Sequence, residues 1–81
     1  MELLILSPER TVFSGKVEKA SFPGAAGRFT VLKGHAPLIA LLAAGTVGYK
    51  PEGGEECSVE IVSGCVRVFA DRIEVCVETA V

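Results

Sequence analysis

A chain of 81 residues, of which 49% are hydrophobic, is long enough for one small folded domain and too hydrophobic to stay disordered. Its net charge of −2 and its isoelectric point near 5.3 argue against nucleic-acid binding, which depends on a basic surface. No apolar run approaches the roughly 18 residues of a membrane span, and the N-terminus has neither the basic start nor the cleavage site of a secretory signal.

Turn-forming residues divide the first part of the chain into short apolar segments. Pro8 favours a tight turn after the first segment, Ser14-Gly15 interrupts the second, and Pro23–Gly27 is expected as a loop. The run Leu3–Leu6 is apolar on both faces, which indicates a strand that is covered on both sides. The strands predicted in this part are Glu2–Ser7, Thr11–Phe13, Lys16–Phe22 and Arg28–Leu32.

Residues 33–38 form a bend between predicted strands, with the only histidine of the chain inside it. Gly34 takes a positive φ at no steric cost. Pro37 fixes its own φ and pushes the preceding residue towards an extended conformation. We therefore expect a stiff bend that holds His35 and Leu38 in defined places.

The second part of the chain continues the pattern of short apolar segments and turns. Leu38–Ala44 is helical by propensity, but its short length between a proline and a glycine favours a strand that is buried on both faces. Pro51–Glu55 indicates an exposed hairpin loop, and further turns are expected at Ser63-Gly64 and Asp71-Arg72. The strands predicted in this part are Leu38–Ala44, Thr46–Lys50, Cys57–Val62, Cys65–Ala70 and Ile73–Val77.

The last strand shows the clearest alternation in the chain. The residues expected to face the core are Ile73, Val75 and Val77, and those expected to point outward are Arg72, Glu74, Cys76 and Glu78. About nine short strands and no long helix are expected in total. The sequence therefore predicts an all-β domain, a β-sandwich or flattened barrel, that comprises residues 1–81 as one unit.

No group of residues in the sequence points to catalysis or to a metal. To act as a base, His35 would need a nucleophile or a carboxylate within reach and a cleft, and the sequence indicates no such arrangement. The odd number and wide spacing of the cysteines fit reduced thiols better than disulfides or a zinc knuckle. Cys57 and Cys65 are expected to pack as small apolar groups, and Cys76 to point outward.

The glycines and the acidic hairpin do not indicate a ligand site either. None of the glycines opens a helix after a strand, as a phosphate-binding loop requires, and the carboxylates of Glu52–Glu56 form a solvated tip. Without a cofactor or an active site, such a domain is expected to work by docking. A second class stays open, a small β-domain that carries a biotinyl or lipoyl group on Lys50, although the Met or Asp that flanks such lysines is missing.

Several short motifs occur in a fixed order along the chain. They are Ser7-Pro8-Glu9, Val12-Phe13-Ser14-Gly15, Val17-Glu18-Lys19, Pro23-Gly24, Gly27, Gly34-His35-Ala36-Pro37-Leu38, Leu42 followed by Gly45, Ser63-Gly64, Val75 and Glu78-Thr79-Ala80. Each motif alone is weak, but together they cover the whole chain. In order and spacing they resemble the N-terminal domain of the epsilon subunit of F-type ATP synthase, the counterpart of the mitochondrial delta subunit.

The resemblance implies a β-sandwich of about ten strands in the central stalk of the rotor. It implies a non-catalytic subunit, peripheral at the cytoplasmic face of the inner membrane, that couples ion translocation to ATP synthesis or hydrolysis. The implied partners are the gamma subunit and the proton-carrying ring of the membrane sector, with no cofactor and no insertion into the membrane. The residues that match gamma-facing positions are Ser7, His35, Ala36, Pro37 and Leu38. The residues that match ring-facing positions are Pro23, Gly24, Gly27 and Arg28.

The sequence departs from the family pattern in three respects. Arg28 stands where the ring-facing turn often carries an acidic residue, so the polar pairing with the ring is expected to be inverted. Cys65 stands where the family has a second glycine, so that turn must accept a side chain. The C-terminal helical hairpin of many members is absent from residues 1–81, and inhibition by an extended helix and ATP sensing are not expected of these residues.

Overall fold

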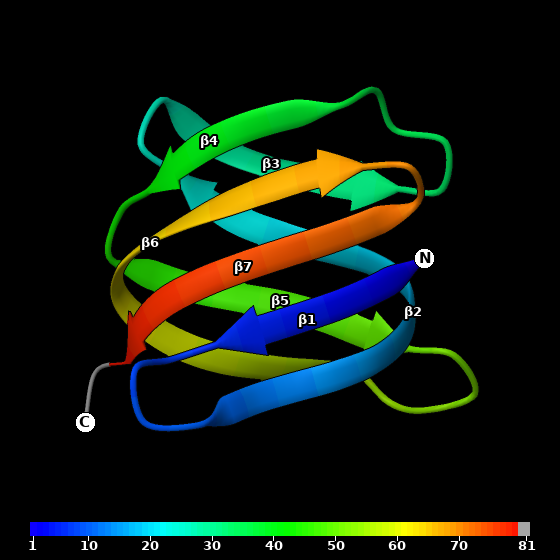
Figure 1. The fold of residues 1–81 in the computed structure, drawn as a ribbon, viewed down its shortest axis with the longest axis horizontal. Helices are drawn as coiled ribbons and strands as arrows, with labels where there is room; N and C mark the ends of the chain where they lie inside the picture. The colour runs from blue at the N-terminus through cyan, green and yellow to red at the C-terminus, as the bar shows by residue number, and fades with distance from the viewer. Residues whose placement is uncertain (80–81) are drawn as a thin grey trace.

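The computed structural model describes residues 1–79, so the expectations at Ala80 and Val81 lie outside the described residues. Short turns connect strands throughout this part of the chain, and it contains no helix (Figure 1). The strands are β1 (Glu2–Leu6), β2 (Thr11–Gly24), β3 (Gly27–Leu32), β4 (Leu38–Leu42), β5 (Gly45–Pro51), β6 (Cys57–Phe69) and β7 (Arg72–Thr79).

The strands pack in two layers, and the all-β sandwich predicted from the sequence is confirmed. The front layer, nearest the viewer in Figure 1, has the order β4, β6, β7, β1, β2. The back layer has the order β3, β2, β5, β6. The paired strands are antiparallel except for β1 and β7, which run parallel.

Strand β2 belongs to both layers. Its residues 11–16 pair with β1 in the front layer, and its residues 17–24 pair with β5 and β3 in the back layer. A register shift between Val17 and Lys19 marks the crossing, because a bulge bends a strand and lets it change sheets. The prediction of two strands divided at Ser14-Gly15 is therefore wrong, since these two residues pair with Leu4 and Leu3 of β1 inside the continuous strand β2.

Strand β6 makes the same crossing in the opposite direction. Residues 57–61 pair with β5 in the back layer, and after a register shift between Ile61 and Ser63 the strand pairs with β7 and β4. The turn predicted at Ser63-Gly64 is wrong. A Cβ on Gly64 would lie 2.7 Å from the backbone oxygen of Cys76, so a close approach of β7 explains this glycine. With β2 and β6 each continuous, the nine predicted strands become seven in residues 1–79.

The core lies between the two layers and takes side chains from every strand. Aliphatic residues dominate it, and the alternation predicted for β7 is confirmed. The buried residues are Leu3, Ile5, Val17, Ala20, Phe22, Val31, Leu42, Val47, Tyr49, Ile61, Val66, Val68, Ile73, Val75 and Val77.

Strand β4 departs from the prediction that both of its faces are buried. The side chains of Ile39 and Leu41 are 79% and 72% exposed, whereas Leu42 faces the core. On β1, Leu4 and Leu6 are half-buried. The physical reason is that a two-layer sandwich covers only the inner face of each sheet. An all-apolar strand in such a fold therefore leaves apolar side chains on the outside.

Candidate docking surface

The bend before β4 has the geometry that its sequence predicts. Gly34 has a φ of +83°, which a residue with a side chain rarely adopts. The backbone NH of His35 donates to the carbonyl oxygen of Leu32 at 3.1 Å, and its ring Nδ1–H donates to that of Ala36 at 2.7 Å. The hollow beside His35 measures about 70 Å³. That is far below the roughly 300–1,000 Å³ of small-molecule sites.

Ser7 closes the turn that follows β1. Its backbone NH donates to the carbonyl oxygen of Arg10 at 2.9 Å. Its hydroxyl donates to the same oxygen at 3.1 Å and accepts from the backbone NH of Arg10 at 3.3 Å. These bonds fix the turn and leave the serine exposed enough to line a hollow with Leu6 and Pro8.

The predicted gamma-facing residues do not form one cluster, but they border one face. β4 and β1 run in the same direction within the front layer, because β6 and β7 between them reverse the chain twice. The start of β4 and the end of β1 therefore lie at opposite ends of the layer (Figure 1). Pro37 and Leu38 line a hollow with Ile39 on the outer face, and Ser7 lines a second hollow there.

The predicted ring-facing residues lie at the turn between β2 and β3. Pro23 and Gly24 are the last residues of β2, and Gly27 begins β3, so the predicted loop is shortened to a two-residue connection. The turn is fixed to the end of β4, because the NH of Ala25 donates to the oxygen of Leu41 at 2.9 Å and the NH of Ala43 to that of Pro23 at 2.8 Å.

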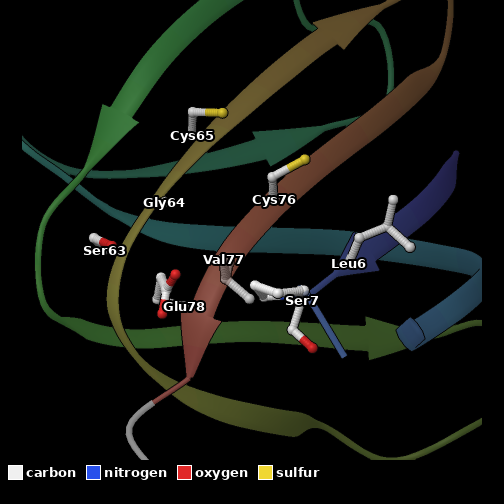
Figure 2. Close-up of a pocket in the computed structure, with 9 residues that line it drawn as sticks. Leu6, Ser7, Ser63, Gly64, Cys65, Cys76, Val77 and Glu78 are labelled. Carbon is white, nitrogen blue, oxygen red and sulfur yellow. The ribbon is translucent and has the colours of Figure 1, made fainter. Parts of the chain in front are cut away.

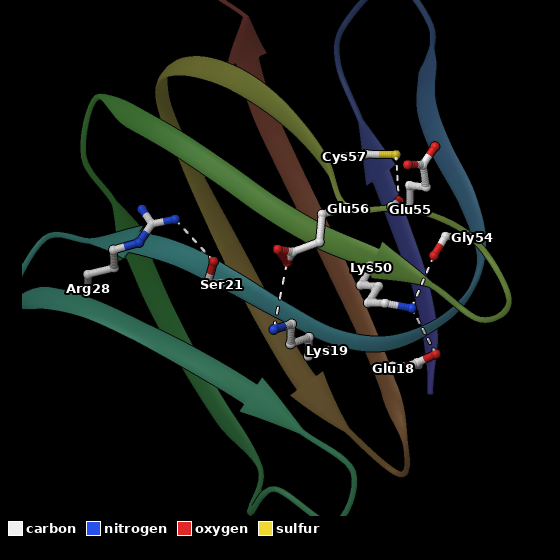
Figure 3. A network of polar contacts seen from close by, with 9 residues as sticks. All are labelled: Glu18, Lys19, Ser21, Arg28, Lys50, Gly54, Glu55, Glu56 and Cys57. Atoms are coloured by element: carbon white, nitrogen blue, oxygen red, sulfur yellow. Dashed lines mark hydrogen bonds and ion pairs between the residues drawn. The ribbon is translucent and has the colours of Figure 1, made fainter.

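Arg28 follows this turn, and its guanidinium is engaged within the chain. Nη1 donates to the carbonyl oxygen of Thr46 at 2.7 Å, and Nη2 donates to the hydroxyl of Ser21 at 3.0 Å (Figure 3). The charge is thus held over β2 and β5, on the outer face of the back layer. Any pairing of Arg28 with a partner at the turn competes with these two bonds.

Sequence reasoning missed the most exposed apolar residues of the chain. The register of the front layer places Leu41, Cys65, Cys76 and Leu6 opposite one another on β4, β6, β7 and β1. We call these four residues the apolar row, and Ile39 lies two residues from Leu41 on the same face of β4. No polar residue interrupts Leu38–Leu42 to mark its outward side, so only the position of β4 in the fold identifies it.

The cysteines show the same dependence on layer position. Cys57, Cys65 and Cys76 are all exposed. The outward direction predicted for Cys76 is confirmed, whereas packing of Cys57 and Cys65 in the core is wrong. Val66 takes the inward position of β6 next to Cys65. Because Cys65 points to the outer face of the front layer, away from the core, the strand accepts its side chain without a turn.

An open hollow of about 590 Å³ lies over the apolar row at the Ser7 end (Figure 2). Its lining includes both row cysteines, Leu6 and Pro8. At the other end of the row, a second hollow of about 350 Å³ lies between the Gly24–Gly27 turn and the exposed face of β4. Along β4 and the apolar row, the outer face of the front layer is therefore a shallow apolar surface that reaches both sets of predicted residues. The neighbouring row of this face carries the ion pair of Arg67 and Glu74 at 3.8 Å.

The outer face of the back layer is mostly polar and internally paired (Figure 3), although Leu32, opposite Lys19, is 55% exposed on it. The ammonium of Lys50 lies 3.1 Å from a carboxylate oxygen of Glu18 and donates to the carbonyl oxygen of Gly54 at 3.0 Å. Lys19 pairs with Glu56 at 3.7 Å. A carrier lysine has to stand free at a hairpin tip, whereas Lys50 is bound inside β5. The structure does not favour the carrier interpretation.

The described residues 1–79 contain neither a group of metal-ligating side chains nor a membrane-spanning helix. No three His, Cys, Asp or Glu side chains in this part lie close enough together to hold a metal ion. No helix in it has the length and hydropathy to cross a membrane.

Burial between the layers, with a smaller contribution from the charge of Cys57, raises the pKa of Tyr49 above its usual value of 10.0.

Comparison with known proteins identifies the family. Residues 1–81 match the family described as ATP synthase, Delta/Epsilon chain, beta-sandwich domain. The ATP synthase epsilon chain of Wolinella succinogenes is 39% identical over 84 residues, covering 100% of this chain and 64% of that protein. The ATP synthase epsilon chain of Desulfatibacillum aliphaticivorans is 36% identical over 78 residues, covering 96% of this chain and 55% of that protein. The chain thus spans between about half and two thirds of these relatives.

Two solved structures share the fold. One is a chain in the cryo-EM structure of Euglena gracilis mitochondrial ATP synthase, OSCP/F1/c-ring, with a TM-score of 0.85 and 22% identity over 98% of this chain and 51% of that one. The other is a chain in the central stalk/c-ring structure of Tetrahymena thermophila mitochondrial ATP synthase, with a TM-score of 0.80 and 16% identity over 96% of this chain and 63% of that one. At these identities the similarity shows the fold alone. The family match and the more similar relatives decide the membership: this chain belongs to the ATP synthase delta/epsilon chain family, and it matches that family's beta-sandwich domain.

Proposed function

We propose that this chain is a non-catalytic rotor component of an F-type ATP synthase, which docks on the gamma subunit and on the membrane ring. In this role it couples ion translocation to the synthesis or hydrolysis of ATP, as a peripheral part of the complex at the cytoplasmic face of the membrane. Family membership supports the assignment, and so does the fold shared with chains of two mitochondrial ATP synthase structures that include the c-ring, one of them described as central stalk/c-ring.

The observation that carries the proposal is the exposed apolar surface of the front layer. Ile39 and Leu41 are the most exposed large hydrophobic residues within residues 1–79, at 79% and 72%, compared with 55% for Leu32 and 51% for Val62. Covering such a side chain contributes about 1.5–3 kcal/mol, and exposed apolar patches on folded proteins mark interaction sites. A partner that covers β4 and the apolar row removes this surface from water.

The geometry supports a division of this surface between the two partners. We assign the bend His35–Leu38 and the Ser7 turn, which border the front face from opposite ends, to gamma. We assign the Gly24–Gly27 turn at the far end of β4 to the ring. Because Ile39 lines a hollow with each set, the two contacts meet on β4.

The test is copurification with tagged gamma subunit and with the membrane ring, using single variants of the full chain. Leu41→Asp is expected to abolish most of the gamma binding, because the partner would have to bury a carboxylate without compensation. Thr30→Asp adds the same group to an exposed position on the outer face of the back layer and is the matched control. Equal recovery of gamma with both variants would contradict the proposal.

A second pair of variants separates the two partners. His35→Asp changes a residue at the predicted gamma contact only, and Arg28→Glu changes a residue next to the predicted ring contact. We expect His35→Asp to reduce recovery of gamma and Arg28→Glu to change recovery of the ring. If His35→Asp affects the ring and leaves gamma unchanged, the division of the surface is wrong.

A further inference from the structure

Cys65 and Cys76 are directly opposite each other on the antiparallel strands β6 and β7. Both are exposed and line the same hollow on the outer face of the front layer (Figure 2). We propose that these two thiols are a redox-sensitive modification site, which closes to a cross-strand disulfide by exchange with a low-molecular-weight disulfide such as oxidised glutathione. The proposal goes beyond the docking function and applies to the undocked chain, because the partner proposed above would cover the apolar row that contains both thiols.

The register supplies the geometry that a disulfide needs. Opposite residues on antiparallel strands have Cα atoms about 4.5–5.5 Å apart, inside the range of about 4.4–6.8 Å found in disulfides. Their Cβ atoms are about 4.5–5.5 Å apart, whereas a disulfide takes about 3.5–4.5 Å. Closing the bond therefore asks for an approach of the two side chains by about 1 Å, which a sheet accommodates without a change of register.

The surroundings leave the two sulfur atoms accessible. Their inward neighbours Val66 and Val75 fill the core, so neither cysteine is needed for packing there. The hollow over them holds about 590 Å³ and is open to solvent, which leaves room for a disulfide of peptide size to approach the thiols. Gly64, next to Cys65, carries no side chain that would block the approach.

The chemistry balances as two successive thiol–disulfide exchanges. The thiolate of one cysteine attacks one sulfur of the low-molecular-weight disulfide, whose S–S bond breaks and releases one thiolate. The thiolate of the second cysteine then attacks the protein sulfur of the mixed disulfide and releases the other thiolate. Two protein thiols are oxidised by two electrons, one small disulfide is reduced to two thiols, and the protons lost by the cysteines end on the released thiols.

Cys57 provides a comparison within the same chain. It is also exposed, but its cross-strand partner on β5 is Tyr49, and its thiol points to the carbonyl oxygen of Glu55 at 3.4 Å. With no thiol opposite, Cys57 has no partner for the second exchange within its sheet. It is expected to stop at the mixed disulfide, whereas the Cys65–Cys76 pair proceeds to the bridge.

The experiment treats the 81-residue chain with oxidised glutathione, blocks free thiols by alkylation and maps the products by mass spectrometry. The expected product has a Cys65–Cys76 bridge, with glutathione on Cys57 alone. Cys65→Ser and Cys76→Ser each leave one thiol on this face, and that thiol is expected to retain its glutathione. The serine replaces an exposed side chain, and circular dichroism checks that each variant keeps its β-structure.

A stability measurement provides the second readout. Because the bridge restrains the unfolded chain, the midpoint of thermal unfolding of the oxidised protein is expected to rise by about 5 °C or more. Dithiothreitol should reverse the rise, and both serine variants should lack it. Glutathione that persists on both Cys65 and Cys76 of the unmutated chain overturns the proposal. So does oxidation that yields covalent dimers through these residues in place of the internal bridge.

Discussion

The two outer faces of the sandwich differ in chemistry although β2 and β6 contribute to both. On the front layer, Leu41 and Ile39 stand exposed, and the register continues their surface through the apolar row. On the back layer, Lys50 and Lys19 pair with carboxylates and Arg28 bonds across two strands. The back face satisfies its polar groups within the chain, and the front face leaves apolar groups for another molecule.

The difference indicates which side of a small two-layer domain is used for assembly. Both faces have similar backbone structure, and the hollows described on them within residues 1–79 are open or small, so the fold alone does not distinguish them. The hydration of the side chains distinguishes the two faces. Covering exposed Ile and Leu with a partner is favourable, whereas exposed ion pairs contribute little. We therefore expect perturbations of the front face to act on binding and those of the back face to act weakly on stability.

The largest effect is expected from a variant that makes the front face as polar as the back face, because it should weaken partner binding. The double variant Ile39→Lys and Leu41→Lys removes two anchors worth about 1.5–3 kcal/mol each, so the Kd for gamma is expected to rise by about 100-fold or more. Unfolding in urea should change by less than about 0.5 kcal/mol, because both residues are exposed. The matched control places lysines at Thr30 and Ser58 of the back layer. An equal loss of binding in the control would remove the distinction between the faces.

Two glycines, one in each layer, test how closely neighbouring atoms pack against the backbone of that layer. In the front layer, Gly64→Ala places a Cβ 2.7 Å from the backbone oxygen of Cys76, and the expected loss of stability is about 2 kcal/mol. In the back layer, the Cβ of Gly48→Ala meets the hydroxyl of Ser21 at 3.1 Å, and that side chain can rotate away. Urea unfolding of both variants measures the difference. A Gly48 variant that is the less stable of the two would contradict this picture of the packing.

The ion pairs of the back face should contribute little. Lys50→Met removes the pair with Glu18 and the bond to the oxygen of Gly54, and a loss of about 0.5 kcal/mol is expected at low salt. High salt should shrink the difference between the variant and the unmutated chain, because screening weakens exposed pairs. A loss several times larger, or one that salt does not change, would mean that the back face is more than a solvated surface.

The smallest effect is expected at Tyr49, whose ring is buried between the layers and packs against that of Phe13. The effect is expected only at alkaline pH. Burial raises the pKa of Tyr49 above the value of 10.0 that it has in the unfolded chain. The corresponding stability is complete below that unfolded value and is lost as the pH rises through the raised pKa. Tyr49→Phe should therefore flatten this part of the curve of unfolding free energy against pH. If the slope is the same in both proteins, Tyr49 does not titrate on unfolding.

The class of fold was accessible from the sequence because turn residues and alternation are local signals. The alternation of Ile73–Val77 predicts the buried face of β7, and the bend at Gly34 adopts the conformation that its residues favour. The continuity of β2 was not accessible in this way. Gly15 resembles a break, but it pairs with Leu3, and the ring of Phe13 lies where a Cβ on Gly15 would point.

The candidate surface was accessible only in part, since motifs locate residues along the chain and not on a face. The resemblance points to Ser7 and to the bend around His35, and the structure places these at opposite ends of one layer. Ile39 and Leu41 carry no signal of their own, because every residue of β4 is apolar. Their exposure follows from the two-layer arrangement of residues 1–79, which leaves the outer face of β4 uncovered, and no single segment of sequence reveals that arrangement.

The passage of β2 and β6 through both layers has a mechanical consequence. In a sandwich of two separate sheets, a sideways load on one sheet is resisted only by interlocking side chains, which can slip. Here the same load is carried through two continuous polypeptide backbones into the opposite sheet. Shear of one sheet over the other would require these two backbones to bend further at their crossings or ladder hydrogen bonds to break. We therefore expect a twisting force received on one side to reach the other mainly through β2 and β6.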